Sequence, residues 1–135
     1  MTTALNILCG ELNLSALEHR FVFALLDGSP IARQGAAFLI PIGDLCKIVE
    51  AQRDSQNIPE VDRDRVLRDQ VAEYLARLLR SPKSLIPANG RANLTLFVLS
   101  RVELGITTFY AECQFDSRFL ALLRSVAASH HVDPY

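Results

Sequence analysis

The sequence contains no tryptophan, and its aromatic residues are seven phenylalanines and three tyrosines. Stacking platforms for single-stranded nucleic acid would therefore have to come from phenylalanines, which otherwise prefer the protein interior. Glycine is also sparse: six glycines stand far apart, and none has the spacing that lets several backbone amides converge on a phosphate. These absences argue against single-strand stacking and against nucleotide binding.

Cysteine and histidine are equally few and scattered. The cysteines are Cys9, Cys46 and Cys113, and the histidines are His19, His130 and His131. The cysteines lack the short paired spacing of a zinc site or a disulfide framework, which predicts reduced thiols that fill the core. No two side chains form the pattern of a nucleophile with a neighbouring general base that a catalytic site requires. We therefore expect no metal, no cofactor and no enzymatic activity.

Strong charge of one sign and long hydrophobic runs are missing as well. The net charge is −1, whereas domains that neutralise phosphates usually carry a basic excess. The first residues, "MTTALNILCGELN", lack the basic region of a secretory signal, and no apolar run approaches membrane-spanning length. Half of the residues are hydrophobic and the chain has 135 residues, which is typical of one packed domain. We expect a cytoplasmic protein without a membrane partner.

Local signals predict three helices and a short strand before residue 81. Residues 14–26 open with Ser15-x-x-Glu18, a capping box that indicates a helix start. A short strand at 38–40 leads into a second helix that ends near residue 52. A polar loop at 53–58 precedes the longest helix, which starts around 59–62 and ends at Arg80.

Turn signals predict paired strands in the second half of the chain. Asn89-Gly90 separates a strand at 84–86 from a longer one at 93–103, and a second turn leads into a strand at 107–115. Asp116 or Ser117 then caps a final apolar helix. The predicted fold is α+β and winged-helix-like: helices, then an antiparallel hairpin or three-stranded sheet, then a C-terminal helix. One domain is expected over 1–128, followed by a disordered tail at 129–135.

A set of basic residues is the nearest pattern to a nucleic-acid footprint. It comprises Arg65, Arg68, Arg77, Arg80, Lys83 and Arg91. Two interpretations stay open: phosphate contacts, or a solvated helix face that also carries Asp69 and Glu73. Cations are favoured at the C-terminal end of a helix by its dipole, so the clustering at the end of the long helix has a structural explanation too.

Three stretches resemble the N-terminal winged-helix domain of initiator replication proteins of iteron-containing plasmids. The first is "LNLSALEHRFVFALL", in which Leu14, Ser15, Glu18 and Arg20 match recurring family positions. The second is "FLIPIGDLCKI", with Phe38, Ile40 and Leu45 at matching positions. The third is "LSRVE", a turn, a strand ending at Phe115, and an apolar helix with Phe119, Leu122 and Leu123. The resemblance covers residues 12–124 and implies a dimerising domain that contacts the phosphate backbone.

The chain also departs from that family. Family initiators typically carry a second winged-helix domain that reads much of the DNA sequence, and this chain ends before one. Ala121 stands where a proline is common, and residues 53–60 resemble an insertion. We expect a non-enzymatic homodimer with modest affinity for double-stranded DNA, its hairpin serving as wing and as part of the dimer surface. The alternative is a small dimer without DNA affinity that binds another protein, as a secretion chaperone or a phage or plasmid regulator does.

Overall fold

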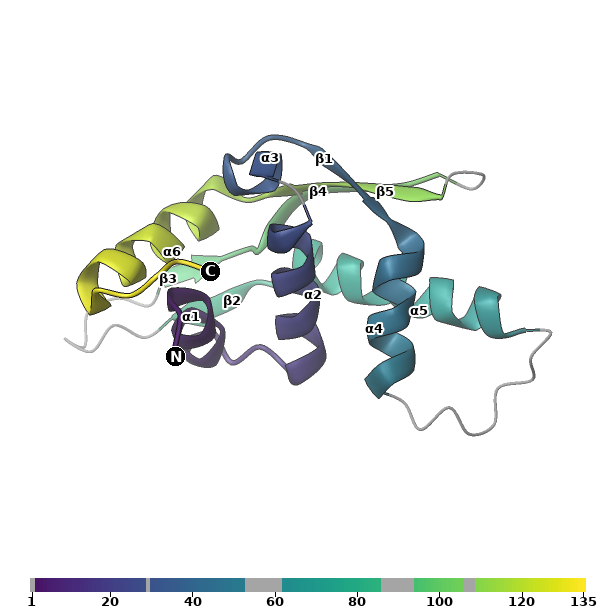
Figure 1. Ribbon diagram of the computed structural model, residues 1–135, viewed down its shortest axis with the longest axis horizontal. Helices are drawn as coiled ribbons and strands as arrows, with labels where there is room; N and C mark the ends of the chain where they lie inside the picture. The colour runs from purple at the N-terminus through teal and green to yellow at the C-terminus, as the bar shows by residue number, and fades with distance from the viewer. Residues whose placement is uncertain (1, 29, 53–61, 86–93, 106–108) are drawn as a thin grey trace.

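The computed structural model describes residues 2–135 apart from residues 29, 53–61, 86–93 and 106–108 (Figure 1). The helices are α1 (Ala4–Glu11), α2 (Ala16–Asp27), α3 (Pro30–Arg33), α4 (Ile42–Gln52), α5 (Arg63–Arg80) and α6 (Ser117–His130). The strands are β1 (Phe38–Pro41), β2 (Lys83–Leu85), β3 (Leu94–Leu96), β4 (Leu99–Leu104) and β5 (Tyr110–Phe115). Within the described residues, no helix is both long and apolar enough to cross a membrane.

The strand order defines the fold. A three-stranded antiparallel sheet has the order β1-β5-β4, and β2 and β3 form a separate two-stranded sheet. Strand β1 lies between α2 and α4 in the chain, and the β4–β5 hairpin follows α5. Helices α2, α4 and α5 with a returning hairpin are the winged-helix variant of helix-turn-helix, so the predicted α+β class is confirmed. In Figure 1, α2 and α4 stand side by side, α5 passes behind α4, and the sheet runs along one end of the helices.

The helix predictions that rest on local signals are confirmed. At the start of α2, the Glu18 N–H donates to Ser15 Oγ at 3.1 Å, and the Ser15 N–H donates to Glu18 Oε1 at 3.1 Å. Helix α4 follows β1 directly, and α6 is capped by Asp116, whose carboxylate accepts from the Arg118 N–H at 2.8 Å. The predicted loop at 53–58 and the turn at Asn89-Gly90 lie outside the described residues.

The single long strand predicted at 93–103 is wrong. The structure divides it into β3 and β4, which belong to different sheets, and the third strand of the main sheet is β1. The division lies at 97–98, where Val98 is buried and its carbonyl accepts a hydrogen bond of 3.0 Å from the Asp116 N–H. The donor, Asp116, directly follows β5. The backbone bends at 97–98, and β3 does not continue into β4 as one strand.

Two helices and the C-terminal segment differ from the prediction. Helix α1 was not foreseen; its N-cap Thr3 accepts from the Asn6 N–H at 3.3 Å. The short α3 lies where a loop was expected. Residues 129–135, expected as a disordered tail, complete α6 and then pack back: the carbonyls of Asp133 and Pro134 accept bonds of 2.8 and 2.9 Å from the first turn of α1. These bonds satisfy N–H groups that a helix start leaves without internal partners.

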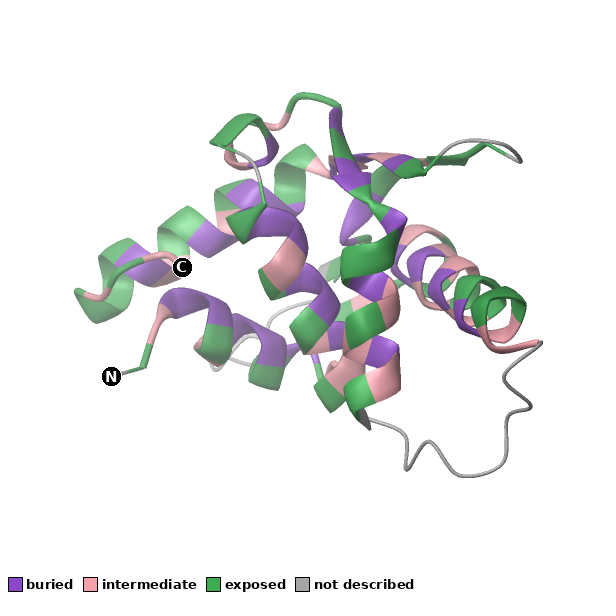
Figure 2. Ribbon diagram, turned by 45° about the vertical axis from the view of Figure 1, so that its right-hand side comes forward, coloured by how far each residue is buried: buried purple, intermediate pink, exposed green. Residues whose placement is uncertain are grey.

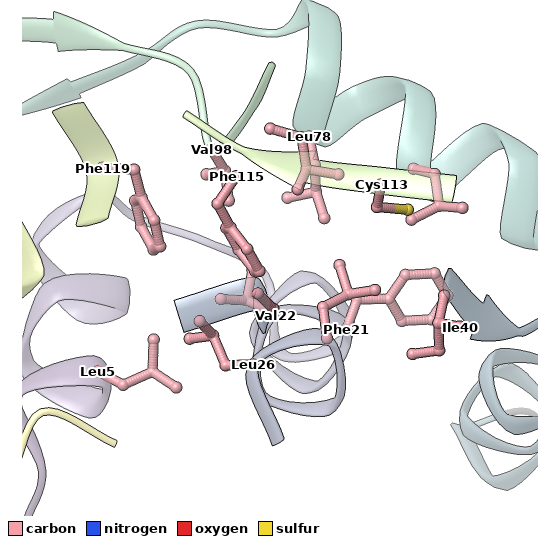
Figure 3. Close-up of a cluster of buried hydrophobic side chains, with 14 of the residues drawn as sticks. Leu5, Phe21, Val22, Leu26, Ile40, Leu78, Val98, Cys113, Phe115 and Phe119 are labelled. Carbon is pink, nitrogen blue, oxygen red and sulfur yellow. The ribbon is translucent and has the colours of Figure 1, made fainter. Parts of the chain in front are cut away.

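The core joins the sheet to the helices on one face. Phe115 of β5 lies between Phe38 of β1 and Phe119 of α6, with ring centroids 5.9 and 5.8 Å apart. Figure 3 shows Phe115 and Phe119 together with Phe21 and Val22 of α2 and Cys113 of β5. Buried aromatic pairs of this kind add about 0.5–1.5 kcal/mol each beyond their burial. Sheet, α2 and α6 are therefore held by one continuous apolar cluster.

An enclosed ion pair links α2 to the small sheet. Glu18 is the one charged residue of the described chain that is buried, and its Oε2 lies 2.9 Å from Lys83 Nζ. Burial alone would raise the pKa of Glu18, but Lys83 and the hydrogen bonds with Ser15 together lower it below its ordinary value. The same carboxyl group thus completes the capping box of α2 and fixes the start of β2.

Replacing Lys83 with methionine should lower the free energy of unfolding by about 1–3 kcal/mol near neutral pH, because Glu18 would stay buried without its partner. The lowered pKa of Glu18 means that the ion pair contributes above the ordinary value of 4.5 and loses its contribution as pH falls through the folded value. The difference in the free energy of unfolding between wild type and Lys83→Met should therefore become smaller in acid. Urea unfolding near neutral pH and at about pH 3 measures it.

The matched control is Arg65→Met, which removes a partner from an exposed ion pair with Asp62. That loss should stay below about 0.5 kcal/mol. If the two variants lost the same free energy of unfolding near neutral pH, the role given to Lys83 would be contradicted.

Candidate functional site

The long helix α5 carries most of the predicted basic residues. Its buried side consists of Leu67, Val71, Leu75 and Leu78, which pack toward α4 and β4. The opposite side faces solvent, as Figure 2 shows by the change of colour around the helix. Helix α5 is the last helix before the strands of the second half of the chain, and it packs against β4.

The exposed side of α5 has mixed charge. Its exposed ionisable residues are Asp64, Arg65, Arg68, Asp69, Glu73, Arg77 and Arg80. Arg65 lies 3.2 Å from Asp62, and Arg77 lies 2.6 Å from Glu73 and also over the ring of Tyr74, 4.9 Å from its centroid. Two of the predicted arginines are thus paired with carboxylates, one at the N-cap of α5 and one within the helix.

The remaining predicted residues have different environments. Arg68 and Arg80 are exposed on α5. Lys83 points its ammonium group toward Glu18 of α2 and retains 16% side-chain exposure. Arg91 lies outside the described residues. Arg68, Arg77 and Arg80 therefore face solvent in the middle and at the end of α5. Lys83 forms an ion pair with Glu18 inside the fold.

A second polar cluster, which the sequence did not single out, lies on the outer face of the sheet. The Arg101 guanidinium on β4 is 2.8 Å from Glu103 Oε1 and 3.1 Å from Glu112 Oε2. Glu103 of β4 and Glu112 of β5 are direct cross-strand partners, so Arg101 separates two like charges. The two carboxylates raise the pKa of Arg101. All three side chains are exposed or partly exposed. The alternation of charged and apolar residues in "SRVEL" is the sequence signal from which this cluster could have been predicted.

Strand β4 forms one edge of the sheet. Within the described residues it pairs with β5 on one side and with no strand on the other. An edge strand presents a row of backbone N–H and C=O groups with free hydrogen-bonding capacity. Arg101 and Glu103 stand on this edge two residues apart, so they project from the same face.

The three cysteines are free and lie in surroundings that raise the pKa of their thiols. Burial raises the pKa of Cys9 and of Cys113 to about 12, with Glu18 and Glu112 adding to the effect. Burial also raises the pKa of Cys46, against a smaller opposing effect of Arg68. Thiols with raised pKa values stay protonated near neutral pH, which disfavours both nucleophilic attack and metal binding. Among the described residues, no group of three histidine, cysteine or acidic side chains is placed to hold a metal ion.

The comparisons with known proteins show a likeness to solved structures but not to a family model. Neither a family nor a curated protein matches the sequence. Among solved structures, the chain is similar to the WH1 domain of MSBI1.176, a replication protein isolated from a multiple sclerosis patient. The superposition covers 97% of this chain and 98% of that chain, with a TM-score of 0.49 and 14% sequence identity.

Proposed function

We propose that this chain is a non-enzymatic winged-helix module that forms a homodimer and contacts double-stranded DNA weakly. The observation that carries the proposal is the arrangement of the β4–β5 hairpin beside α5, with β4 as an open edge of the sheet. The hairpin then serves both as the wing and as the dimer surface, and α5 faces the DNA backbone.

The charges on β4 support pairing between two copies. If the β4 strands of two copies align antiparallel about a two-fold axis at Val102, Arg101 of each copy stands opposite Glu103 of the other. Opposite charges in direct cross-strand positions contribute about 0.2–1 kcal/mol per pair, and the backbone of the edge gains hydrogen-bond partners. A shift of the axis by one residue would place like charges opposite each other, so the charges also select the register.

The charges on α5 support a weak contact with DNA. Arg68, Arg77 and Arg80 face outward, but Asp69 and Glu73 lie on the same exposed side. Each cation that neutralises a phosphate adds to affinity through release of counterions, and neighbouring carboxylates oppose that gain. The balance favours phosphate contacts without base readout.

A second candidate function is a dimer that binds another protein and not DNA. The pairing of Arg65 with Asp62 and of Arg77 with Glu73, together with the enclosure of Lys83, favours it. The two functions differ in their response to salt, because phosphate contacts weaken steeply with ionic strength and β-edge contacts do not.

Reversing one charge on β4 should weaken the pairing of two copies through this strand. Arg101→Glu places like charges opposite each other at two symmetric positions, so the dissociation constant should rise about tenfold or more. Exchanging both residues, in Arg101→Glu with Glu103→Arg, restores opposite charges across the axis and should restore this pairing. The exchanged chain also keeps a cation opposite Glu112. Sedimentation velocity over a concentration series measures the association.

Arg124→Glu is the control, because it reverses an exposed charge on α6 away from the sheet. It should leave the assembly unchanged. A wild-type chain that stays monomeric at high concentration, or a double exchange that associates no better than Arg101→Glu, would refute the β4 pairing.

Binding to duplex DNA should be weak and should fall steeply as salt rises. Removing one phosphate contact by Arg80→Gln should lower affinity for all duplex sequences alike and reduce the slope of log K against log salt by about 0.9. A mobility-shift titration with two unrelated duplexes at low and moderate salt measures both quantities. Arg124→Gln serves as the matched control. Negligible binding to DNA at low salt would refute the proposed DNA contact and favour the dimer that binds another protein.

A further inference from the structure

We propose that the exposed face of α2 is a second self-association surface, on which α2 of another copy packs antiparallel. The inference does not depend on the β4 pairing. Its basis is a groove between α2 and α4 with a volume of about 700 Å³. The apolar part of its lining includes Phe23 and Ala24 of α2, its C-cap Gly28, Ile40 of β1 and Ile48 of α4.

Phe23 is the feature that the fold does not explain. Its neighbour Phe21 is completely buried, whereas Phe23 is 51% exposed on the outer side of the same helix. Ala24 follows it on the helix and carries only a methyl group, so another helix can approach the backbone of α2 closely at this point. Exposed aromatic side chains beside small residues are typical anchors of helix contacts.

The charges around Phe23 select a second copy of α2 as the occupant. Arg20 stands about one turn before Phe23 and Asp27 about one turn after it, and both line the groove. When two α2 helices cross antiparallel about an axis between residues 23 and 24, Arg20 of each copy lies opposite Asp27 of the other. The Phe23 ring then meets Ala24 of the second copy, so a large side chain fits against a small one.

The acidic end of the groove reinforces this complementarity. Asp44 of α4 lines the groove together with Asp27, and His19 lies beside Arg20 at the other end. The Asp27 side chain is 69% exposed, and its ion pair with Arg33 is long, at 3.8 Å. A two-fold contact supplies both charge pairs from one sequence, whereas an unrelated helix would need the matching charges independently.

The α2 face and the β4 edge do not overlap. The groove is lined by Ile40 and Pro41 of β1, and β1 and β4 are opposite edges of the sheet. A chain with two separate two-fold contacts forms dimers of dimers or longer assemblies. We therefore expect the association of the wild-type chain to continue beyond the dimer.

The test isolates the α2 contact by blocking the β4 edge. In the Arg101→Glu background, sedimentation velocity should still detect a dimer. Adding Phe23→Ser should weaken that dimer at least about tenfold, because a central aromatic anchor of an interface is removed. Adding Phe109→Ser, which removes another exposed phenylalanine at the end of the hairpin, should leave the dimer intact.

Charge exchange on α2 gives an independent readout. Arg20→Asp should break the dimer, and Arg20→Asp with Asp27→Arg should restore it. Because residues 20 and 27 are two turns apart on one helix, such a rescue indicates pairing between copies. Circular dichroism of each variant confirms that it is folded. Equal association constants with and without Phe23→Ser would overturn the proposal, as would a double exchange that fails to recover association.

The outcomes separate this inference from the proposed function. Loss of β4 pairing alone leaves an α2 dimer, and loss of the α2 contact alone leaves a β4 dimer that still shows salt-dependent DNA binding. A monomer in the Arg101→Glu background would refute the α2 contact without affecting the β4 proposal.

Discussion

The antiparallel pairing of β1 with β5 is the constraint on which the rest of this structure depends. These strands lie far apart in the chain, and their register sets Phe38 opposite Cys113 and Ile40 opposite Ala111. All four residues are buried, so a shift of one position would turn apolar side chains toward water. The stacked rings of Phe38, Phe115 and Phe119 then carry the same contact into α6. The hairpin is thereby fixed to a bundle assembled before it in the sequence.

This pairing also decides which surfaces remain available. Because β1 occupies one side of β5, the hairpin can place only β4 at the free edge. Because β1 runs directly into α4, the same pairing sets α4 beside α2 and shapes the groove between them. The open edge and the open groove consequently lie on opposite borders of the sheet. Each of them carries a cation and an anion, Arg101 with Glu103 and Arg20 with Asp27, at a spacing that a two-fold axis can match.

The sequence predicts the elements whose signals are local and misses those that depend on distant contacts. The capping box of Ser15 and Glu18 identifies the start of α2 because both partners lie within one turn. The break at 97–98 depends on a hydrogen bond with Asp116, so the strand pattern alone predicts a continuous strand. Likewise, nothing near Lys83 in the sequence reveals its partner, because Glu18 belongs to another helix. A basic residue on a helix end and a basic residue in an enclosed ion pair look alike before the fold is known.

The distribution of charge favours the proposed self-association over tight DNA binding. On α5, carboxylates alternate with arginines, and the nearest lysine is used to hold β2 against α2. Such a surface has little net positive potential to attract a polyanion, whatever the total number of arginines. On β4 and α2, by contrast, balanced charges are an advantage, because a two-fold contact matches each cation to an anion of the other copy. The near-zero net charge of the chain, −1, is compatible with the proposed self-association and does not favour a strong phosphate-binding surface.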